Sequence, residues 1–386
     1  MNKIKVGVLF GSRSVEHEVS IVTAMQIFAN IDRNKYEVIP IYIDKKGSWR
    51  LGPDLDKLES FRNLELIQKN KFIEFKMPDQ VDTFEISPVA NRLLGPKPQK
   101  IDIMIPAIHG TYGEDGTLQG LLEMAGIPYT GCDVSSSALG MDKVAQKAIY
   151  EKEGIPVVKY LWFYDWEWEQ YKENLITKVE KYLSYPVCVK PANLGSSIGV
   201  NIVNNRKDFI WAVSVAENFD KKVIIEEGLV GIDEINISVM GNNDLEASVC
   251  EQPVKNKGLL SYEEKYLRGG KTKGMASLSR LVPAPISPTL TKTIQDYAKR
   301  AFRALGCSGV SRIDFLVDIK KEKVYINEIN TLPGSLSFYL WEKSGYTFTQ
   351  LIDKLIKLGF EKFESKKSKL YSINSNILRG SSGTKA

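Results

Sequence analysis

The sequence is poor in the residues that build thiolate and imidazole sites. Its 386 residues include two histidines, His17 and His109, and four widely separated cysteines: Cys132, Cys188, Cys250 and Cys307. No two cysteines form a C-x-x-C pair and no histidine lies near one, which excludes the common zinc motifs. We therefore expect four reduced, buried cysteines that act as small apolar side chains.

The sequence also lacks a long apolar stretch. No uninterrupted apolar run approaches the roughly 20 residues that a helix needs to cross a bilayer. The first apolar run ends at Gly11 and is followed by charged residues, which does not fit a signal peptide. These absences predict a cytoplasmic protein with no membrane partner.

Charge of one sign is not concentrated anywhere. Lys and Arg total 52 against 47 for Asp and Glu, a net charge of +5 spread along the chain. Nucleic-acid binding would call for a clustered basic face, so we expect no nucleic-acid partner. The chain is 43% hydrophobic and too long for one typical domain, which predicts two or three domains.

The first part of the chain has the pattern of an α/β sheet. Apolar, β-branched residues predict strands at 4–10 and 36–43, and a helical pattern over 18–31 separates them. Such a β-α-β start predicts parallel strands with right-handed crossovers. A further strand at 101–108, a short strand end at 129–131 and helices at 118–124 and 135–154 follow, and residues 44–100 elaborate this domain.

The rest of the chain alternates strands with a few helices. We predict strands at 157–163, 186–190, 200–203, 223–227, 235–240, 247–253, 313–319 and 324–329, with helices at 167–183, 206–218, 289–305 and 348–358. The predicted domains are 1–134, 135–233 and 234–363. A polar tail, 364–386, carries little core signal and is expected to be loosely held.

Polar residues gather near the end of the third predicted domain. Asp314 lies in one strand, and Glu328 and Asn330 lie two residues apart at the end of the next, so a hairpin would bring them together. Two carboxylates and an amide oxygen form an oxygen-only set that suits Mg²⁺ bridging nucleotide phosphates. A solvated strand face would carry the same residues.

Three other segments have the residues of a binding site. Lys190 ends an apolar strand before a Gly- and Ser-rich loop that could lie over phosphates, although the Walker A order is absent. Glu16 and His109 follow two strands of the first sheet, where α/β proteins bind ligands. The polar stretch 262–266 could be a lid. An ordinary turn, a capped helix start and a solvated loop remain the respective alternatives. His17 is expected on the surface of the first helix.

Taken in order, these segments resemble the D-alanine–D-alanine ligase family of ATP-grasp enzymes. The resemblance runs from about residue 4 to residue 358. It rests on Glu16-x-Glu-Val-Ser, His109-Gly through Gly120, Met141-Asp-Lys, Lys190-Pro through Gly199, Glu264-Lys-Tyr, Arg312-Ile-Asp and Asn327-Glu-x-Asn-Thr-x-Pro-Gly334. It implies a three-domain ATP-grasp architecture, α/β and α+β, whose N-terminal domain is an open parallel α/β sheet.

The resemblance also implies a role for each matching residue. ATP would be held by Lys143, Lys190, Glu226, Glu227, Leu229, Glu234 and, from the lid, Lys265. Two Mg²⁺ ions, for which Mn²⁺ can substitute, would bind Asp314, Glu328 and Asn330. Glu16 would hold the ammonium of the first D-amino acid, with His109 near its carboxylate. Glu16, Ser196 and Tyr266 would close the lid, and Arg312 and the Gly334 N–H would stabilise the oxyanion.

The implied reaction makes D-alanyl-D-alanine for peptidoglycan precursors in a homodimeric enzyme. The chain departs from the family after Gly334, where Ser335 to Glu342 replaces the Met-Thr-x-His-Ser of many members and forms the wall of the second-substrate site. A sister ligase that uses D-serine therefore remains open. D-Lactate is disfavoured by Tyr266, and a nucleotide-binding protein without ligation is a third reading. The Glu16 and His109 crevice argues against an ATP-grasp carboxylase.

Overall fold

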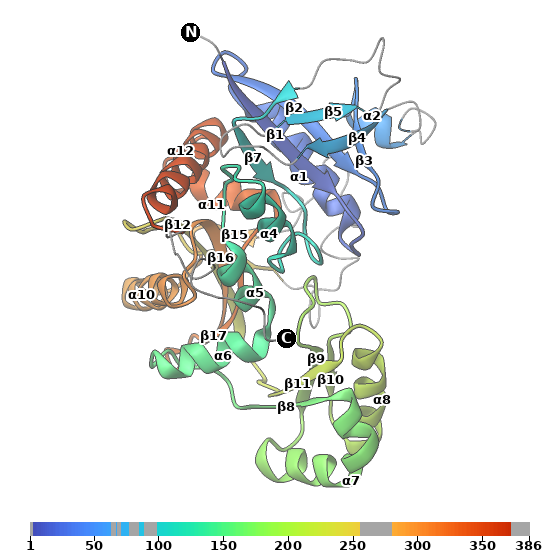
Figure 1. The fold of residues 1–386 in the computed structure, drawn as a ribbon. Coiled ribbons are helices and arrows are strands. Elements are labelled where there is room, and N and C mark those ends of the chain that lie inside the picture. The colour runs from blue at the N-terminus through green and yellow to red at the C-terminus, as the bar shows by residue number, and fades with distance from the viewer. Residues whose placement is uncertain are drawn as a thin grey trace, which may run out of the picture.

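The computed structural model describes residues 3–62, 67, 71–76, 85–88, 99–254 and 280–371. Three groups of elements are visible in Figure 1: an N-terminal sheet, a central lobe that contains α7 and α8, and a C-terminal sheet covered by α10. The predicted lid segment, including Lys265 and Tyr266, lies outside the described residues.

The N-terminal sheet is mixed, and only its core is parallel. β1 (Ile4–Gly11) pairs in parallel with β2 (Tyr36–Ile43) on one side and with β7 (Ile103–Pro106) on the other. Short antiparallel strands extend the edge beyond β2, namely β3 (Trp49–Leu51), β4 (Lys71–Lys76), β5 (Glu85–Pro88) and β6 (Gln99–Lys100). The prediction of an open parallel sheet is therefore correct for the centre alone, because the elaboration at 44–100 adds strands with the opposite direction.

Helices α1 (His17–Asn30) and α4 (Thr117–Met124) accompany this sheet. The predicted helix at 135–154 is two helices, α5 (Val134–Met141) and α6 (Lys143–Lys152), because Asp142 leaves helical geometry and caps α6 with its side chain. The expected strand end at Tyr129 is an isolated bridge to Met104.

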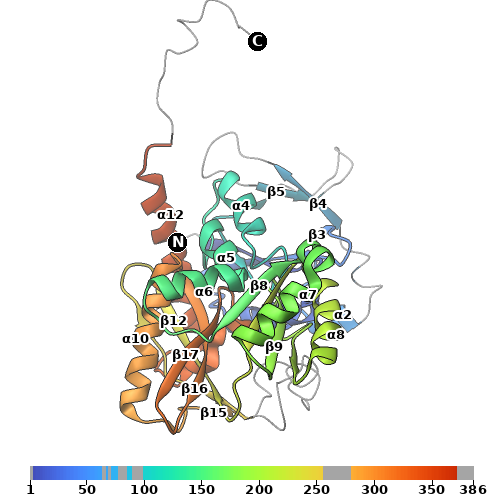
Figure 2. The ribbon, with the colours of Figure 1, turned by 90° about the horizontal axis from the view of Figure 1, so that it is seen from below.

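The central lobe is a four-stranded antiparallel sheet with two helices on one face. Its strands run in the order β10 (Asn201–Val203), β9 (Val187–Pro191), β11 (Lys222–Glu227) and β8 (Tyr160–Tyr164). Helices α7 (Asp165–Tyr182) and α8 (Arg206–Glu217) pack on alternate residues such as Val189, Val223 and Ile225 (Figure 2). Strand alternation therefore turns Lys190 and Glu226 to the opposite face.

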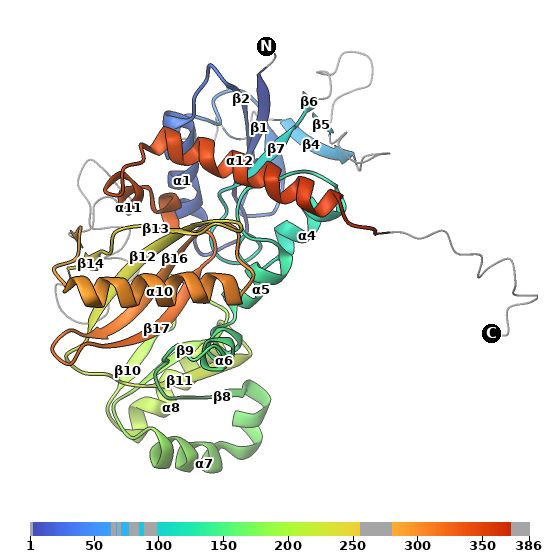
Figure 3. The ribbon, with the colours of Figure 1, turned by 90° about the vertical axis from the view of Figure 1, so that its left-hand side faces the viewer.

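The C-terminal sheet follows the same principle. Its order is β13 (Glu246–Ala247), β12 (Asp233–Gly241), β16 (Gly309–Asp318) and β17 (Lys323–Asn330), and β14 (Gln252–Pro253) pairs separately with β15 (Arg280–Leu281). Helix α10 (Pro288–Ala304) covers the apolar face that contains Ile237, Ile313 and Phe315 (Figure 3). The polar residues of the same strands face the other way, toward the rest of the molecule.

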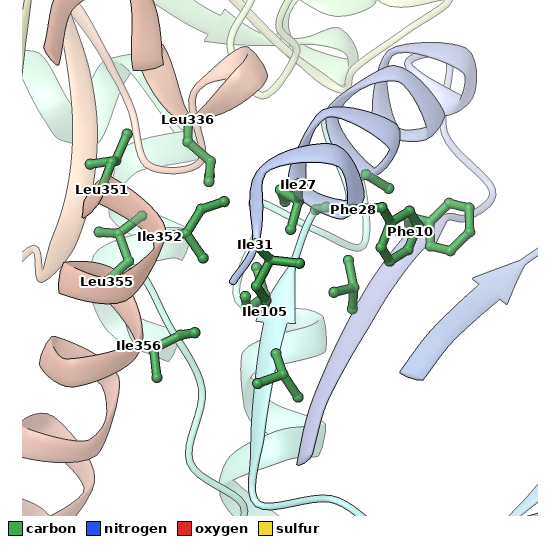
Figure 4. Packing of buried hydrophobic residues seen from close by; sticks show 14 of the residues in the cluster. Phe10, Ile27, Phe28, Ile31, Ile105, Leu336, Leu351, Ile352, Leu355 and Ile356 are labelled. Atoms are coloured by element: carbon green, nitrogen blue, oxygen red, sulfur yellow. The ribbon is translucent and has the colours of Figure 1, made fainter. Parts of the chain in front are cut away.

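The C-terminal helix α12 (Phe348–Lys367) packs against elements of the N-terminal domain. Its residues Ile352 and Leu355 share one apolar core with Ile27 of α1 and Ile105 of β7, as Figure 4 shows. The helix is longer than predicted and continues past residue 363. Lys366 in its last turn forms ion pairs with Glu123 and Asp133, at 2.5 and 3.5 Å. The first predicted domain therefore shares its core with the last helix.

None of the helices in the described part of the chain is long and apolar enough to cross a membrane. All four cysteines are buried and free, as the sequence analysis predicted. The prediction of one strand at 247–253 was wrong, because the run is divided between β13 and β14, with an isolated bridge at Glu251.

Candidate active site

Two pockets meet between the three groups of elements. One lies beside the polar face of the central sheet and has an empty volume of about 1270 Å³. The other lies between the N-terminal sheet and the C-terminal sheet and contains about 730 Å³. Gly195, Glu234 and Glu328 line both pockets, so the two pockets adjoin each other. We refer to them as the lysine pocket and the arginine pocket, after their cationic residues.

The lysine pocket collects the residues predicted to bind ATP. Those in the described part of the chain all line it: Lys143, Lys190, Glu226, Glu227, Leu229 and Glu234. Lys143 follows the cap of α6, and its Nζ lies 2.7 Å from the Leu194 carbonyl oxygen and 3.1 Å from Glu328. This position puts an ammonium between the Gly- and Ser-rich loop and the predicted metal ligands.

A buried charge cluster fixes the second lysine. Glu226 lies between Lys147 and Lys190, at 2.9 and 2.6 Å, and its side chain is 3% exposed. Burial alone would raise the pKa of Glu226, but the two ammonium groups outweigh burial and hold that pKa at about 2. Burial lowers the pKa of Lys147, whereas Glu226 outweighs burial for Lys190 and raises its pKa. Lys147 could not be identified from the sequence, because nothing in its helical context distinguishes it from a surface lysine.

The predicted metal ligands form the centre of a polar row across the C-terminal sheet. Asp314 and Glu328 are direct partners in the pairing of β16 with β17, and Asn330 pairs with Arg312 two residues along the strands. The hairpin inferred from the sequence is therefore confirmed. Asn236 pairs with Asp314 on the other side, and Glu251 bridges to Asn236, which completes the row Glu251, Asn236, Asp314, Glu328.

Facing carboxylates repel each other, and cations compensate for them here. Arg312 donates from Nε and Nη2 to both oxygens of Asp314 at 2.7 Å, while Lys143 pairs with Glu328. Burial would lower the pKa of Arg312, but Asp314 outweighs it, and the pKa is raised. Within the described residues no group of three or more His, Cys, Asp or Glu side chains could hold a metal. Two carboxylates plus Asn330 nonetheless fit Mg²⁺, which takes one or two carboxylates and completes its shell with water and phosphate.

The arginine pocket collects the residues predicted to act on the amino acids. Its lining includes Glu16, His109, Ser196, Arg312 and Gly334. The Ser196 hydroxyl donates to Glu16, which joins the loop of the central lobe to the start of α1. Gly110 is required beside them, because a Cβ there would lie 2.7 Å from Glu16 Oε2.

His109 organises the wall beyond Gly334. Its Nε2 lies 2.8 Å from Thr23 Oγ1 and its Nδ1 lies 3.0 Å from the Leu332 carbonyl oxygen. Thr23 in turn accepts from the Ser335 N–H at 3.1 Å. His109 is therefore linked to this wall twice, directly at Leu332 and through Thr23 of α1 at Ser335.

That wall begins with an unusual turn. Ser335, Leu336 and Ser337 all have left-handed φ values, of 54°, 53° and 52°. Each such residue costs roughly 1–2 kcal/mol relative to the right-handed conformation. Burial of Leu336 in the core shared with α12 offsets this strain. Short α11 (Phe338–Glu342) follows, and the hydroxyl of its Tyr339 donates to Glu251 at one end of the polar row.

The other histidine is not a surface residue. His17 is buried, with Nδ1 2.6 Å from the Ser12 carbonyl oxygen and Nε2 3.0 Å from the Tyr42 hydroxyl. Burial lowers its pKa. The prediction failed because its partner Tyr42 comes from β2, and the helical pattern of α1 alone does not show that contact.

Comparisons with known proteins agree with this arrangement. A family model described as "D-ala D-ala ligase N-terminus" matches residues 5–132, and one described as "D-ala D-ala ligase C-terminus" matches residues 149–357. A D-alanine–D-alanine ligase from Thermosipho melanesiensis is 44% identical over 380 residues, covering 97% of this chain and 98% of the relative. One from Natranaerobius thermophilus is 41% identical over 378 residues, covering 95% and 97%.

Solved structures give the same result. The D-alanine–D-alanine ligase of Coxiella burnetii superposes with a TM-score of 0.78 at 29% identity, over 95% of this chain and 97% of that one. A D-Ala:D-Ser ligase from Enterococcus faecalis superposes with a TM-score of 0.79 at 33% identity, over 93% and 100%. The fold and the paired pockets define an ATP-grasp ligase. Within that class, the chain belongs to the D-alanine–D-alanine ligase family.

Proposed function

We propose that the protein joins two D-alanine molecules to D-alanyl-D-alanine, with ATP converted to ADP and a D-alanyl phosphate as intermediate. The observation that carries the proposal is the contact of the two pockets at Gly195, Glu234 and Glu328. A nucleotide in the lysine pocket would present its terminal phosphate to a carboxylate in the arginine pocket. The family uses ATP with divalent metal ions, and its product serves peptidoglycan synthesis.

The nucleotide is assigned to the lysine pocket. Lys143 and Lys190 neutralise its phosphates, and the segment Glu226, Glu227, Leu229 and Glu234 borders adenine and ribose. The role at the γ-phosphate is assigned to Lys265, which lies outside the described residues. Asp314, Glu328 and Asn330 would hold two Mg²⁺ ions, or Mn²⁺ in their place. The ions would supply charge neutralisation for the phosphoryl oxygens. Lys143 and Arg312, which pair with Glu328 and Asp314, would also contact substrate oxygens.

The first D-alanine is assigned to the Glu16 side of the arginine pocket. Glu16, 6% exposed and held by Ser196, pairs with its ammonium, and His109 lies near its carboxylate. The carboxylate attacks the γ-phosphorus, and the P–O bond to ADP breaks. The product is an acyl phosphate, a far better electrophile than the carboxylate it replaces.

The second D-alanine then attacks with its neutral amine. The N–C bond forms through a tetrahedral intermediate, whose oxyanion accepts from Arg312 and the Gly334 N–H. Inorganic phosphate leaves with the electron pair of the C–O bond and takes up the proton that the amine loses. Closure of the set Glu16, Ser196 and Tyr266 excludes water, which would hydrolyse the acyl phosphate. We also propose a cytoplasmic homodimer, without nucleic-acid or membrane partners, as the working form.

D-Alanyl-D-serine is the alternative product. Two observations favour it: the likeness to a D-Ala:D-Ser ligase, and the departure of Ser335 to Glu342 from the usual family pattern. D-Alanyl-D-lactate is a weaker alternative, and ATP binding without ligation is the weakest.

Product identity tests the proposal. The purified protein is incubated with ATP, Mg²⁺, D-alanine and an equal amount of D-serine or D-lactate, and the products are identified by mass spectrometry. The expected product is mostly D-alanyl-D-alanine. A mostly mixed product would establish the alternative, and ADP without any dipeptide would reject ligation.

A further inference from the structure

Two guanidinium groups line the arginine pocket within the part of its lining that the structure describes. They belong to Arg280 and Arg312 and stand among five carboxylates: Glu16, Glu114, Glu234, Glu251 and Glu328. Arg312 donates through Nε and Nη2 to Asp314. Arg280 comes from β15 and belongs to none of the motifs that identified the family.

Arg280 is held in a fixed orientation by two neighbours. Its Nη1 donates to Glu251 Oε2 at 3.1 Å, and its Cζ lies 3.8 Å from the centre of the Tyr339 ring. The Tyr339 hydroxyl donates to the other Glu251 oxygen at 2.7 Å. Glu251 is 1% exposed and receives a further hydrogen bond from Asn236 Nδ2 at 3.3 Å. A planar guanidinium held in this way loses little conformational freedom when it binds an anion.

The place of Arg280 in the polar row matters for charge. Lys143 and Glu328 mark the end of the row that adjoins the lysine pocket, where phosphates are proposed to bind. Glu251 and Arg280 mark the opposite end. The carboxylate of an attacking amino acid would be repelled by phosphate and therefore needs a cation on the side away from the nucleotide.

The two sides of the pocket also divide the substrates. The Glu16 side suits an ammonium, and Arg312, Gly334 and Arg280 line the same chamber. An amino acid whose carboxylate meets Arg280 would direct its amine toward the Arg312 region, where the acyl phosphate is attacked. Free carboxylate, rather than side chain, is the feature that Arg280 can read, because a guanidinium fork matches a carboxylate with two hydrogen bonds.

We infer that Arg280, positioned by Glu251 and Tyr339, binds the α-carboxylate of the second D-amino acid. This inference rests on the proposed function and deepens it, since it assigns the nucleophile's carboxylate to a residue outside the family motifs. It also explains the departure at Ser335 to Glu342, because that segment contributes the aromatic ring on which Arg280 stacks.

The test uses D-alaninamide, which has the attacking amine but no carboxylate to be phosphorylated or bound. D-Alaninamide can therefore replace only the second substrate, not the first. With ATP, Mg²⁺, D-alanine and excess D-alaninamide, the ratio of D-alanyl-D-alanine to D-alanyl-D-alaninamide is measured by mass spectrometry. We expect Arg280→Gln to lower this ratio by about 100-fold, the loss of one charge-assisted pair. Arg280→Lys, which keeps charge without the fork, should give an intermediate ratio.

A second measurement separates binding from folding. In Arg280→Gln, the D-alanine concentration for half-maximal rate should rise about 100-fold while that for ATP changes less than about threefold. Arg300→Gln on the surface of α10 is the matched control and should change neither. An unchanged product ratio, or a fall in kcat with both concentrations unchanged, would overturn the inference. Absence of dipeptide from the wild-type protein would instead reject the proposed function.

Discussion

Glu328 and Glu251 occupy opposite ends of one polar row, and their surroundings differ. The Glu328 side chain is 23% exposed, faces both pockets and pairs with Lys143. The Glu251 side chain is 2% exposed and receives hydrogen bonds from Arg280, Tyr339 and Asn236. A carboxylate meant to exchange its partner for a metal must remain accessible, whereas one that positions another residue can be fully enclosed. The same side chain in the same row is therefore accessible at the Glu328 end, where a metal is proposed to bind, and enclosed at the Glu251 end. We call these the open end and the closed end of the row.

The largest expected effect is on turnover, at the open end. Glu328→Gln should lower kcat by about 10³-fold, because it removes a charge that is proposed to hold the metal. The free energy of unfolding without metal should change by only about 1 kcal/mol, because the Glu328 side chain is 23% exposed and Lys143 keeps the Leu194 carbonyl oxygen as a partner. The rate of ADP formation gives kcat, and urea unfolding gives the free energy of unfolding. Glu173→Gln, on the exposed surface of α7, is the control. A large loss of stability with unchanged kcat would remove the contrast between the two ends.

The buried cluster in the lysine pocket extends the comparison to a third glutamate. Glu226→Gln should destabilise the protein by about 3 kcal/mol at pH 7, because two buried ammonium groups lose their counter-charge. The folded pKa of about 2 lies below the usual 4.5, so the stabilisation is complete above pH 5 and is lost as pH falls from about 4.5 toward 2. The difference between wild type and variant, followed by urea unfolding, should therefore shrink on acidification. A difference that grew on acidification would mean that Glu226 is protonated in the folded protein.

At the closed end the expected loss is in stability. Glu251→Gln should lower the free energy of unfolding by about 2 kcal/mol, since Arg280 and Tyr339 lose a charged acceptor in a dry site. Glu246→Gln, half-exposed in the neighbouring strand, should cost less than about 0.5 kcal/mol. Urea unfolding of both variants at equal protein concentration gives the comparison. Equal effects would indicate that water reaches Glu251 as readily as Glu246.

The smallest effect concerns the hydroxyl of Tyr339. Tyr339→Phe keeps the ring beside Arg280 and removes one hydrogen bond to Glu251, which should cost about 1 kcal/mol. Burial, and then Glu251, raises the pKa of Tyr339, so the hydroxyl remains a donor over the whole physiological range. Turnover should stay within a few-fold of wild type. Tyr371→Phe, largely exposed, is the stability control. A loss of turnover beyond tenfold would assign the hydroxyl a direct part in the reaction.

The open end of the row could be predicted from the sequence, and the closed end could not. Asp314, Glu328 and Asn330 lie in two adjacent strands joined by a tight turn, so local alternation was enough to place them on one face. Glu251 joins the row through an isolated bridge to Asn236, fifteen residues earlier in the chain, within a run predicted as a continuous strand. Arg280 follows the segment predicted to be a lid and has no sequence signal of its own. Contacts that depend on tertiary register are invisible to local pattern.

The fold shows the same division between local and distant information. The strands β1, β2 and β11 and the helices α1, α7 and α8 were predicted to within a few residues, because each has a clear period. The mixed direction of the first sheet was missed, since residues 44–100 show no regular period. The length of α12 was also underestimated, because its last turns are polar and are held by Lys362 and Lys366, which contact Gly131 and Glu123.

The shared core of α1, β7 and α12 has a consequence for how the protein is made. Ile27 and Ile352 contact one core but leave the ribosome at very different times, since 352 − 27 = 325 positions separate them. At elongation rates of about 5–20 residues per second, the N-terminal sheet waits roughly 15–65 s for its last apolar cover. During synthesis that face is exposed to chaperones and to other nascent chains. That apolar face is therefore covered only when the whole chain has been made, and not when the first domain is complete.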